Sequence, residues 1–482
     1  MKISRVLVLV VLTYVAASTV LATKPNIVVI LADDLGFSDV GWRNPALHSP
    51  TLDRLAREGV VLNQAYVQPS CSPSRAALMS GRYPYHLGLQ HSGLSAGHVG
   101  YLPDDQPILP ETLKSLGYAT HAVGKWHLGF CNWRYTPTYR GFDSFYGFYN
   151  AEEDYYNHTG HRDAYDFRDD DQVDVTAKGH YSTHLFTDRA IRIIRRHNSS
   201  QPLFLYLSFQ AVHTPLEVPE YYMHRFCSHI NDTDRQIKCG MIAAMDEAVA
   251  NVTHVLEQQG LADNTFLLFS SDNGGPVKTG GSNWPLRGSK TTIWEGGTRA
   301  VAFMHAPNLL QKSGYTYNEL IHVVDWYPTF VEAGGGSNLS NIDGVSQWQN
   351  LLAGTPGPRF EFIYNIDDVF NNAAIRQGRY KLTQGHMNGP NGWFAPPEMT
   401  NETTVEVHVN RHNEPAYQLF DLEADPEEKH SILDTHQHVF QRLKFRLDEY
   451  RPSIVPTDPS GDVFVHEANP KYFNDVWSPG WC

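Results

Sequence analysis

Short runs of aliphatic and aromatic residues, separated by longer amphipathic stretches, constrain the fold of this chain more than any other feature. Each run is bounded by turn-forming residues, which is typical of strands buried on both faces of a largely parallel sheet. The runs in the first two-thirds of the chain lie at residues 26–32, 202–209, 265–270 and 299–305. Candidate helices between them lie at 51–58, 110–116, 183–197 and 237–259. The pattern predicts a large α/β layer.

A second, smaller region follows the glycine-rich segments at 334–336 and 354–358. Further strand-like runs lie at 360–364, 374–382 and 417–421, and a helix is expected over 436–450. We therefore expect a small α+β domain with an antiparallel sheet, packed on the large one and separated from it by a boundary known to within about ten residues. The expected division is a leader over 1–22, a large domain over 23–355 and a small domain over 356–482.

The charge balance excludes one broad class of function. The 482 residues include 38 Lys and Arg against 52 Asp and Glu, which gives a formal net charge of −14. Nucleic-acid-binding surfaces are basic, so no nucleic-acid partner is expected. The 24 histidines would add positive charge in an acidic compartment.

The N-terminus is typical of a secretory leader. Lys2 and Arg5 precede an apolar run over 6–15, and small or aliphatic residues up to Ala22 offer a cleavage site. A membrane anchor is the alternative, but the apolar run is short for a spanning helix. We expect cleavage, which leaves a mature chain with no stable membrane anchor.

Six Asn-x-Ser/Thr sequons follow the leader and favour a glycosylated protein of the secretory route. They lie at Asn157, Asn198, Asn231, Asn251, Asn338 and Asn401. We expect these positions at the surface. Extracellular, luminal and lysosomal destinations all remain open.

Oxygen-rich loops follow two of the expected strands. Asp33 and Asp34 come directly after the first strand, and Asp272 and Asn273 come after the third. The carboxyl ends of strands are where open α/β sheets bind ligands. Carboxylate and amide oxygens suit Ca²⁺ or Mg²⁺ better than zinc. Each loop by itself is also an ordinary turn sequence, which is the alternative interpretation.

A third motif places a cysteine near the start of a helix. A helix-forming stretch follows Pro73, so Cys71 lies at or before a helix N-terminus, where the local field favours an anion. Arg75 is about one turn further on, and its guanidinium can return to the same pocket. A disulfide cysteine followed by a helix cap is the alternative. Cys71-x-Pro73-x-Arg75 resembles the sulfatase signature, in which the cysteine is oxidised to formylglycine, although Ser80 stands where Thr or Ala is more usual.

Residues 117–127 resemble the second sulfatase signature along their whole length. Lys125 and His127 are two residues apart, so in an extended segment they would face one side as two cationic donors. A solvated lysine and a core histidine are the alternative. Two weaker pieces, around His213 and Lys290, resemble sulfatase segments that supply a histidine and a lysine to the sulfate oxygens.

The resemblance covers most of the chain, from Pro25 to a C-terminal segment that contains Asp425, Pro426 and Glu428. Within the family, the chain looks like the arylsulfatase B type, the N-acetylgalactosamine-4-sulfatases. The resemblance implies an alkaline-phosphatase-like α/β sandwich with a large mixed, mostly parallel sheet and a smaller C-terminal α+β domain with an antiparallel sheet. That fold agrees with the layout expected from the strand pattern.

The resemblance also implies a nucleophile and a metal. Cys71, as hydrated formylglycine, attacks sulfur, and inorganic sulfate leaves by elimination. A divalent cation, Ca²⁺ more than Mg²⁺, polarises a sulfate oxygen. Its implied ligands are Asp33, Asp34, Asp272, Asn273 and the modified Cys71. A formylglycine-generating enzyme is the implied partner during secretion.

The remaining implied catalytic residues are basic. Arg75 and Lys125 fix the charges beside the metal and the formylglycine oxygens, and His127 takes part in proton transfer at the diol. His213 and Lys290 protonate the leaving oxygen. Lys125, His213 and Lys290 are the implied substrate-binding residues.

With Cys71 assigned to the modification, four cysteines remain and three pairings are possible. Cys227–Cys239 closes a short loop and is the expected pair, which leaves Cys131–Cys482. Free buried thiols are the alternative and are unusual in a secreted chain.

The substrate is less constrained than the reaction. A terminal sulfated N-acetylgalactosamine or an aryl sulfate is expected, and small sulfated metabolites such as steroid sulfates or plant defence glucosides are the alternative. A phosphate or phosphonate ester hydrolase of the same superfold commonly uses a second metal with further His or Asp ligands, and the sequence offers one convincing set. A binding glycoprotein on an inactive sulfatase fold would be expected to lack some of these residues. Candidate specificity loops are 152–171, which includes Asp154, Tyr155 and Tyr156, and 388–397.

Overall fold

The structure of the protein is a computed structural model that describes residues 24–337, 339–387, 389–399, 415–457 and 463–482. The predicted leader over 1–22, the sequons at Asn338 and Asn401, and the loop residue Asn388 lie outside the described residues.

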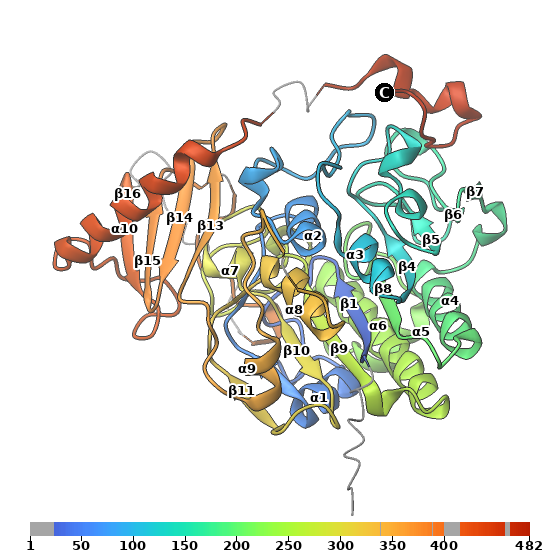
Figure 1. Ribbon diagram of the computed structural model, residues 1–482, viewed down its shortest axis with the longest axis horizontal. Coiled ribbons are helices and arrows are strands. Elements are labelled where there is room, and N and C mark those ends of the chain that lie inside the picture. Colours follow the sequence, from blue (N-terminus) through green and yellow to red (C-terminus); the bar gives the residue numbers. More distant parts are fainter. Residues whose placement is uncertain (1–23, 338, 388, 400–414, 458–462) are drawn as a thin grey trace, which may run out of the picture.

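The described residues form one large mixed sheet of ten strands and one small antiparallel sheet of four (Figure 1). The strand order of the large sheet is β11 (Tyr315–Tyr317), β2 (Val60–Leu62), β10 (Ala302–His305), β9 (Thr265–Ser271), β1 (Asn26–Ala32), β8 (Leu203–Ser208), β4 (Ala119–Lys125), β5 (Ser144–Phe148), β6 (Arg168–Asp169) and β7 (Gln172–Val173). A separate pair joins β3 (Ala65–Tyr66) to β12 (Ile321–His322). The predicted fold class is confirmed.

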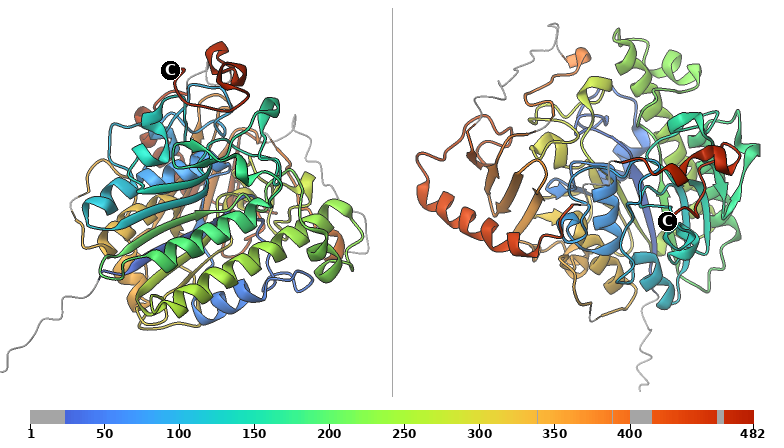
Figure 2. Two further views of the ribbon diagram at one scale, coloured as in Figure 1. Left: turned by 90° about the vertical axis from the view of Figure 1, so that its right-hand side faces the viewer. Right: turned by 90° about the horizontal axis from the view of Figure 1, so that it is seen from above.

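Helices cover both faces of the large sheet (Figure 2). Successive residues of β1 alternate between the two hydrophobic cores, because side chains of a strand point to opposite faces. One core contains residues of α1 (Pro50–Glu58), α4 (Ser182–Arg196) and α6 (Thr233–Gln258), and the other contains residues of α2 (Cys71–Ser80), α3 (Leu109–Ser115) and α8 (Trp326–Ala333). Shorter helices are α5 (Glu220–Phe226), α7 (Glu295–Thr298) and α9 (Trp348–Ala353).

The four central strands explain where a site can form. β9, β1, β8 and β4 are neighbours in the sheet and run parallel to one another. Their carboxyl ends therefore meet at one edge. β4 and β5 are strands that the sequence analysis did not predict, since Thr120, His121 and Gly124 interrupt the apolar pattern of β4.

The small sheet follows in the chain and packs beside the large one. It contains β13 (Glu361–Asp367), β14 (Asn372–Gln377), β15 (Tyr380–Gln384) and β16 (Tyr417–Asp421), with α10 (Gln437–Tyr450) against it. The predicted strand over 374–382 is wrong, because a turn divides it between β14 and β15. Gly378 has a φ of 57° in that turn, a left-handed conformation that glycine adopts without a steric penalty.

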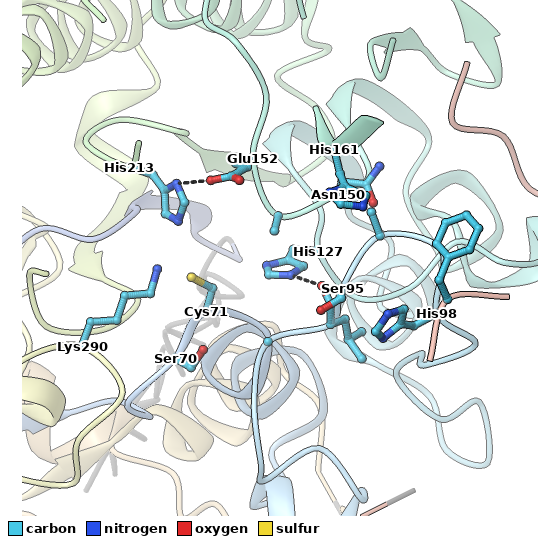
Figure 3. A pocket seen from close by; sticks show the side chains of 15 residues that line it. Ser70, Cys71, Ser95, His98, His127, Asn150, Glu152, His161, His213 and Lys290 are labelled. Atoms are coloured by element: carbon cyan, nitrogen blue, oxygen red, sulfur yellow. Dashed lines mark hydrogen bonds and ion pairs between the residues drawn. The ribbon is translucent and has the colours of Figure 1, made fainter. Parts of the chain in front are cut away.

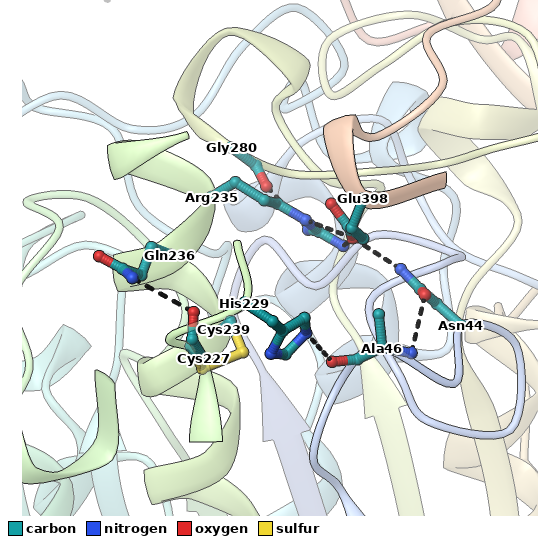
Figure 4. Close-up of a disulfide and its surroundings, with 9 residues drawn as sticks. All are labelled: Asn44, Ala46, Cys227, His229, Arg235, Gln236, Cys239, Gly280 and Glu398. Atoms are coloured by element: carbon teal, nitrogen blue, oxygen red, sulfur yellow. Dashed lines mark hydrogen bonds and ion pairs between the residues drawn. A yellow bond between two sulfur atoms is a disulfide. The ribbon is translucent and has the colours of Figure 1, made fainter. Parts of the chain in front are cut away.

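Both expected disulfides are present, Cys227–Cys239 and Cys131–Cys482. The first lies near the ion pair of Arg235 with Glu398 (Figure 4). The second fastens the last residue of the chain beside the large sheet (Figure 1). The asparagines of the four described sequons are exposed, as expected. None of the described helices combines the length and the apolar character needed to span a membrane.

Candidate active site

The edge formed by the central strands brings the predicted metal ligands together. Asp33 and Asp34 follow β1, Asp272 and Asn273 follow β9, and all four are buried. The two loops contact each other directly. Nδ2 of Asn273 donates to Oδ1 of Asp34 at 2.7 Å, and the backbone N–H of Asp34 donates to Oδ1 of Asp272 at 3.2 Å.

Two fully buried cations hold these carboxylates in place. Arg75 on α2 donates from Nε and Nη2 to Oδ2 of Asp272, at 3.0 and 2.8 Å. Nζ of Lys125, at the end of β4, lies 2.5 Å from Oδ2 of Asp33. Neither side chain is exposed, so both cations act on the carboxylates from below the surface of the site.

The carboxylates respond differently to this burial. Burial would raise the pKa of Asp34, but Lys290 and His213 help to lower it well below its usual range. Asp272 shows the opposite shift, because burial and the neighbouring Asp33 raise its pKa. Carboxylates that repel one another in a buried site are stabilised by a bound cation.

Cys71 is the first residue of α2 and lies against the same cluster. Its Sγ donates to Oδ1 of Asp33 at 3.4 Å. It is the one cysteine outside the two disulfides. Burial and the charge of Asp33 raise the pKa of the Cys71 thiol. The unmodified side chain is therefore a neutral thiol, which is a weak nucleophile.

His127 lies just beyond the end of β4, where the backbone leaves the extended conformation. Its φ of 55° is left-handed, so the expected arrangement of Lys125 and His127 on one side of an extended segment is wrong. Nε2 of His127 donates to the carbonyl oxygen of Leu94 at 2.8 Å, and Nδ1 has no hydrogen-bond partner among the described residues. Burial and Lys125 hold the pKa of His127 well below its usual range. The ring is therefore a neutral proton acceptor and not the second cation that the sequence predicted.

His213 and Lys290 approach Asp34 from two different loops. Nζ of Lys290 lies 2.7 Å from Oδ1 of Asp34, and Nε2 of His213 lies 3.5 Å from Oδ2. Burial lowers the pKa of His213 to about 4, with Lys290 adding to the effect and Asp34 opposing it. Burial would also lower the pKa of Lys290, but Asp34 raises it well above its usual range. At neutral pH, Lys290 carries a charge and His213 does not.

A pocket of about 530 Å³ opens over this cluster (Figure 3). Cys71, His127, His213 and Lys290 all line it, so the predicted nucleophile and three predicted basic residues share one cavity. Arg75, Lys125 and the predicted metal ligands other than Cys71 lie beneath the lining. The arrangement places the predicted nucleophile, Cys71, and the charged Lys290 beside a buried group of carboxylates.

Comparisons with known proteins agree with this geometry. The Sulfatase family profile matches residues 25–336. Arylsulfatase J of Mus musculus is 39% identical over 492 residues, which cover 96% of this chain and 81% of the relative.

The chain belongs to the sulfatase family.

Other relatives include N-acetylgalactosamine-6-sulfatase of Mus musculus, 30% identical over 497 residues that cover 95% of this chain and 91% of the relative. A crystal structure of Ps i-CgsB in complex with k-i-k-neocarrahexaose has a TM-score of 0.79 and 27% identity, over 94% of this chain and 97% of the solved one. This sulfatase is accordingly a sulfuric ester hydrolase, and its substrate is a sulfated molecule.

Several lining residues of the sulfatase pocket were not among the predicted site residues. They include Ser95, His98, Asn150, Glu152, His161 and Phe464. Glu152 and His161 fall inside the predicted specificity loop 152–171, whereas Phe464 comes from the C-terminal segment and no sequence pattern marks it. Oε2 of Glu152 lies 3.5 Å from Nδ1 of His213, and half of its side chain is exposed.

The predicted specificity loops differ in where they lie. Tyr155 is fully buried, and its hydroxyl donates to the carbonyl oxygens of Gln210 and His213, at 3.1 and 2.9 Å, so it supports the His213 loop from below. The described residues of 388–397 do not line the active-site pocket. Phe394 from that loop lines a different pocket of about 360 Å³.

Lys238 on α6 is a further buried group near the cluster. Nζ of Lys238 has no hydrogen-bond partner among the described residues. Burial lowers its pKa, and the charges of Asp34 and Asp39 oppose that shift. Its position within a long helix carried no sequence signal, because a lysine in a helix is usually solvated.

Proposed function

We propose that this sulfatase hydrolyses sulfate monoesters through a formylglycine at position 71 and one Ca²⁺ ion. The observation that carries the proposal is the position of Cys71, at the start of α2, on the wall of the pocket and in contact with Asp33. The substrate we propose is a sulfated sugar of the N-acetylgalactosamine 4-sulfate type or an aryl sulfate.

The side chains present fit a calcium ion. Oδ1 of Asn273 is buried without a hydrogen-bond partner among the described residues, although Nδ2 of the same side chain is fully used. Asp33, Asp34 and Asp272 add carboxylate oxygens, and oxygen-only ligand sets favour Ca²⁺ or Mg²⁺ over zinc. Residue 71 completes the proposed set. When bound, the ion would polarise a sulfate oxygen and favour ionisation of the nucleophile.

The nucleophile we propose is the hydrated aldehyde of residue 71. Its oxygen forms the bond to sulfur as the bond from sulfur to the ester oxygen breaks, and loss of sulfate restores the aldehyde. Nδ1 of His127 has a free lone pair in the neutral ring, so His127 can accept the proton that the diol releases. Lys125 and Arg75 hold Asp33 and Asp272 in place during these steps.

The leaving oxygen develops negative charge as the ester bond breaks. Lys290 is the charged group beside the sulfate position, so it stabilises that charge electrostatically. Nδ1 of His213 donates to the carbonyl oxygen of Thr214 at 2.7 Å, which leaves Nε2 facing the site. His213 delivers a proton to the leaving oxygen once the anionic substrate has favoured its protonation.

A sugar ring is the favoured leaving group because the pocket continues well beyond Cys71 and offers polar side chains to hydroxyl or amide groups. Asn150, Glu152 and His161 are among these side chains. The named relative N-acetylgalactosamine-6-sulfatase and the oligosaccharide-bound Ps i-CgsB also support a glycan. The arylsulfatase J relative supports an aryl sulfate. Small sulfated metabolites such as steroid sulfates are the second candidate.

A phosphate or phosphonate ester hydrolase is a less favoured function. The described residues contain a single group of three or more His, Cys, Asp or Glu side chains able to share a metal, namely Asp33, Asp34, Cys71 and His213. Two-metal phosphoryl transfer would need a second set.

The division of the chain and its cellular route are also proposals. We propose a cleaved leader over 1–22, a catalytic domain over 23–355 and a small domain over 356–482, with passage through the secretory pathway to the lysosome or the cell exterior. There the chain would meet a formylglycine-generating enzyme before folding closes over Cys71, which is 3% exposed in the folded protein.

Peptide mass spectrometry of the secreted protein tests the proposal directly. We expect formylglycine at position 71, and near-complete loss of activity in Cys71→Ser, because a serine sulfate ester lacks the second hydroxyl on the same carbon that expels sulfate from the hemiacetal. Full activity in protein that carries only unmodified Cys71 would overturn the mechanism. A panel of sulfated N-acetylgalactosamine, aryl and steroid esters then separates the two substrate candidates.

A further inference from the structure

The C-terminal segment with Asp425, Pro426 and Glu428 has no part in the chemistry described above, although it belongs to the sulfatase-like sequence pattern. Glu428 is fully buried, and its backbone φ of 57° is left-handed, a conformation that is uncommon for residues other than glycine. The Glu428 carboxylate also makes contacts outside the small sheet. It reaches across to the loop of residues 286–297 in the large domain, which carries Lys290.

A closed cluster of charges joins the two domains at this point. Nζ of Lys381 on β15 lies 2.7 Å from Oε1 of Glu428 and 3.1 Å from Oε1 of Glu295 on α7. Oε2 of Glu428 accepts from the backbone N–H of Glu295 at 2.7 Å. All three side chains are fully buried. Glu428 therefore binds the end of the Lys290 loop through both of its oxygens, directly at one and through Lys381 at the other.

A second set of contacts holds the beginning of the same loop. Nε of Arg287 donates to Oδ1 of Asn391 at 2.9 Å, and the backbone N–H of Gly288 donates to the carbonyl oxygen of Gly392 at 2.8 Å. Nη1 of Arg287 also donates to the carbonyl oxygen of Glu428, at 3.4 Å. The C-terminal part of the chain thus forms hydrogen bonds with residues on both sides of Lys290 in the sequence.

The middle of the loop faces the reaction centre and is strained. Thr291 has a φ of 74°, which is a genuine outlier for a β-branched residue. Its backbone N–H donates to the carbonyl oxygen of Pro69 at 2.7 Å, two residues before Cys71. Such a conformation persists only when the surrounding structure fixes it. The hydrogen bond from Oγ of Ser289 to the carbonyl oxygen of Gly275 supplies part of that constraint from the large domain, and the contacts from the C-terminal domain add to it. Lys290, the neighbour of Thr291, reaches Asp34 from this loop.

We propose that Glu428, acting with Lys381 and Glu295, is a positioning group that holds Lys290 at the sulfate position from the C-terminal domain. This inference rests on the proposed role of Lys290 in stabilising the leaving oxygen. It gives the C-terminal domain a part in catalysis without any contact to substrate.

The alternative is that the cluster merely stabilises the domain interface. Buried ion pairs are weak stabilisers, because the desolvation of the charges offsets most of their attraction, and apolar residues of similar volume serve as well or better. Directional contacts from buried charges are better suited to fixing one geometry. The cluster also ends on the loop that carries Lys290.

The test compares Glu428→Ala and Glu428→Gln with Lys290→Ala on two aryl sulfates, one with a good leaving group and one with a poor one. We expect Glu428→Ala to lower kcat roughly 10-fold to 100-fold for the poor leaving group, and several-fold less for the good one, as Lys290→Ala does. Glu428→Gln keeps an oxygen acceptor for the Glu295 N–H and should retain most activity. The double variant Lys290→Ala/Glu428→Ala should be no slower than Lys290→Ala alone.

Glu361→Ala is the matched control. Glu361 is a carboxylate of the same small sheet, and it accepts from Arg446 and the Tyr450 hydroxyl on the side away from the loop. Its removal should leave kcat unchanged. Asn391→Ala, which removes a neutral side chain, should give a loss of about two-fold to five-fold with the same leaving-group dependence and serves if Glu428→Ala does not fold.

Equal losses on both esters, or fully additive effects in the double variant, would overturn the positioning role. If Lys290→Ala itself has no effect on either ester, the proposed role of Lys290 is wrong and Glu428 has no catalytic group to position. If Lys290→Ala is impaired and neither Glu428→Ala nor Asn391→Ala is, the role of Lys290 stands and only the positioning role of Glu428 is wrong.

Discussion

Two groups of buried charges lie about the Lys290 loop, and they differ in what their oxygen atoms are bound to. The strand-edge cluster contains Asp33, Asp34, Asp272, Arg75, Lys125 and Lys290. The interface cluster contains Glu295, Glu428, Lys381 and Arg376, with the hydroxyls of Tyr66 and Tyr364. The first lies under a pocket, and the second joins residues of the small sheet to Glu295 of α7 and Tyr66 of β3.

Every carboxylate oxygen of the interface cluster lies against a donor or a cation of the same cluster. Oε1 of Glu428 makes no hydrogen bond with standard geometry among the described residues, but it is ion-paired with Nζ of Lys381 at 2.7 Å. Oε1 of Glu295 accepts from the Tyr364 hydroxyl at 2.7 Å and pairs with Lys381, while Oε2 accepts from the Tyr66 hydroxyl at 2.8 Å. In the strand-edge cluster, by contrast, Oδ1 of Asn273 is left without a partner among the described residues. Since buried polar atoms are nearly always bonded, the comparison indicates that the strand-edge cluster is built to receive something and the interface cluster is not.

The largest effect should follow from removing a ligand of the strand-edge cluster. Asp272→Ala deletes one oxygen ligand and releases Arg75, so we expect metal and activity to be lost together, with kcat/KM lower by about 10⁴-fold, or about 5.5 kcal/mol. Steady-state kinetics and elemental analysis on the same preparation test this. An Asp272→Ala enzyme that keeps its metal but loses activity would contradict the assignment.

The interface cluster should respond in stability and leave the metal in place. Lys381→Met leaves two carboxylates facing each other without their shared cation, and breaking a buried pair in this way costs about 3 kcal/mol of unfolding free energy. Urea denaturation measures that loss. One calcium ion per chain should remain bound, whereas kcat for a poor leaving group should fall as in Glu428→Ala, because Lys381 acts with Glu428 on the Lys290 loop. Loss of the metal would show that the interface cluster also supports the metal ligands.

The fold was predicted best where both faces of a strand are apolar. β1, β8 and β9 are aliphatic or aromatic except for polar residues at their ends. The loops after β1 and β9 bring the predicted metal ligands together, as expected. β4 was missed because polar residues and glycine interrupt it, although it carries Lys125 at its end. Hydrophobic periodicity identifies buried strands whose side chains are apolar, but it cannot detect a strand whose polar side chains form hydrogen bonds inside the protein.

The site was predicted through short motifs, and what the motifs could not convey is conformation. His127 was expected on an extended segment, yet its left-handed backbone turns it into the pocket as a neutral base. Phe464 and Glu428 come from C-terminal segments that only the tertiary fold brings to the pocket or the Lys290 loop. Contacts between residues so far apart in sequence leave no local signal.

The pH dependence of stability should sharpen the comparison further. Burial raises the pKa of Glu428 to about 7, with Glu295 adding to the shift and Lys381 opposing it. Because this pKa exceeds the unfolded value of 4.5, the stabilising contribution is complete below about pH 4.5 and is lost as pH rises through 7.

The expected loss is about 2 kcal/mol between pH 5 and pH 8. Glu428→Gln cannot titrate at this position. The difference in unfolding free energy between the native protein and this variant therefore isolates the contribution of Glu428 from those of the other titrating groups. The difference should favour the native protein more at pH 5 than at pH 8. A difference that is constant with pH would show that Glu428 stays in one protonation state.

The smallest effect is expected at the open mouth of the strand-edge cluster. Glu152 is half exposed near His213, so its charge should disfavour a second anionic group on the substrate. We expect Glu152→Gln to change the ratio of kcat/KM between neutral and anionic aryl sulfates by about two-fold to five-fold, because screening is strong at an exposed site. An unchanged ratio would show that the carboxylate does not face the substrate.

The measurement that tests the account most directly is the metal content of the secreted protein, taken together with its activity after chelation. The unpartnered oxygen of Asn273 and the three neighbouring carboxylates predict one calcium ion per chain, loss of activity when it is removed, and recovery when calcium is returned. Stoichiometric zinc, or full activity in a metal-free preparation, would contradict the claim that the strand-edge cluster is built around an oxygen-bound cation.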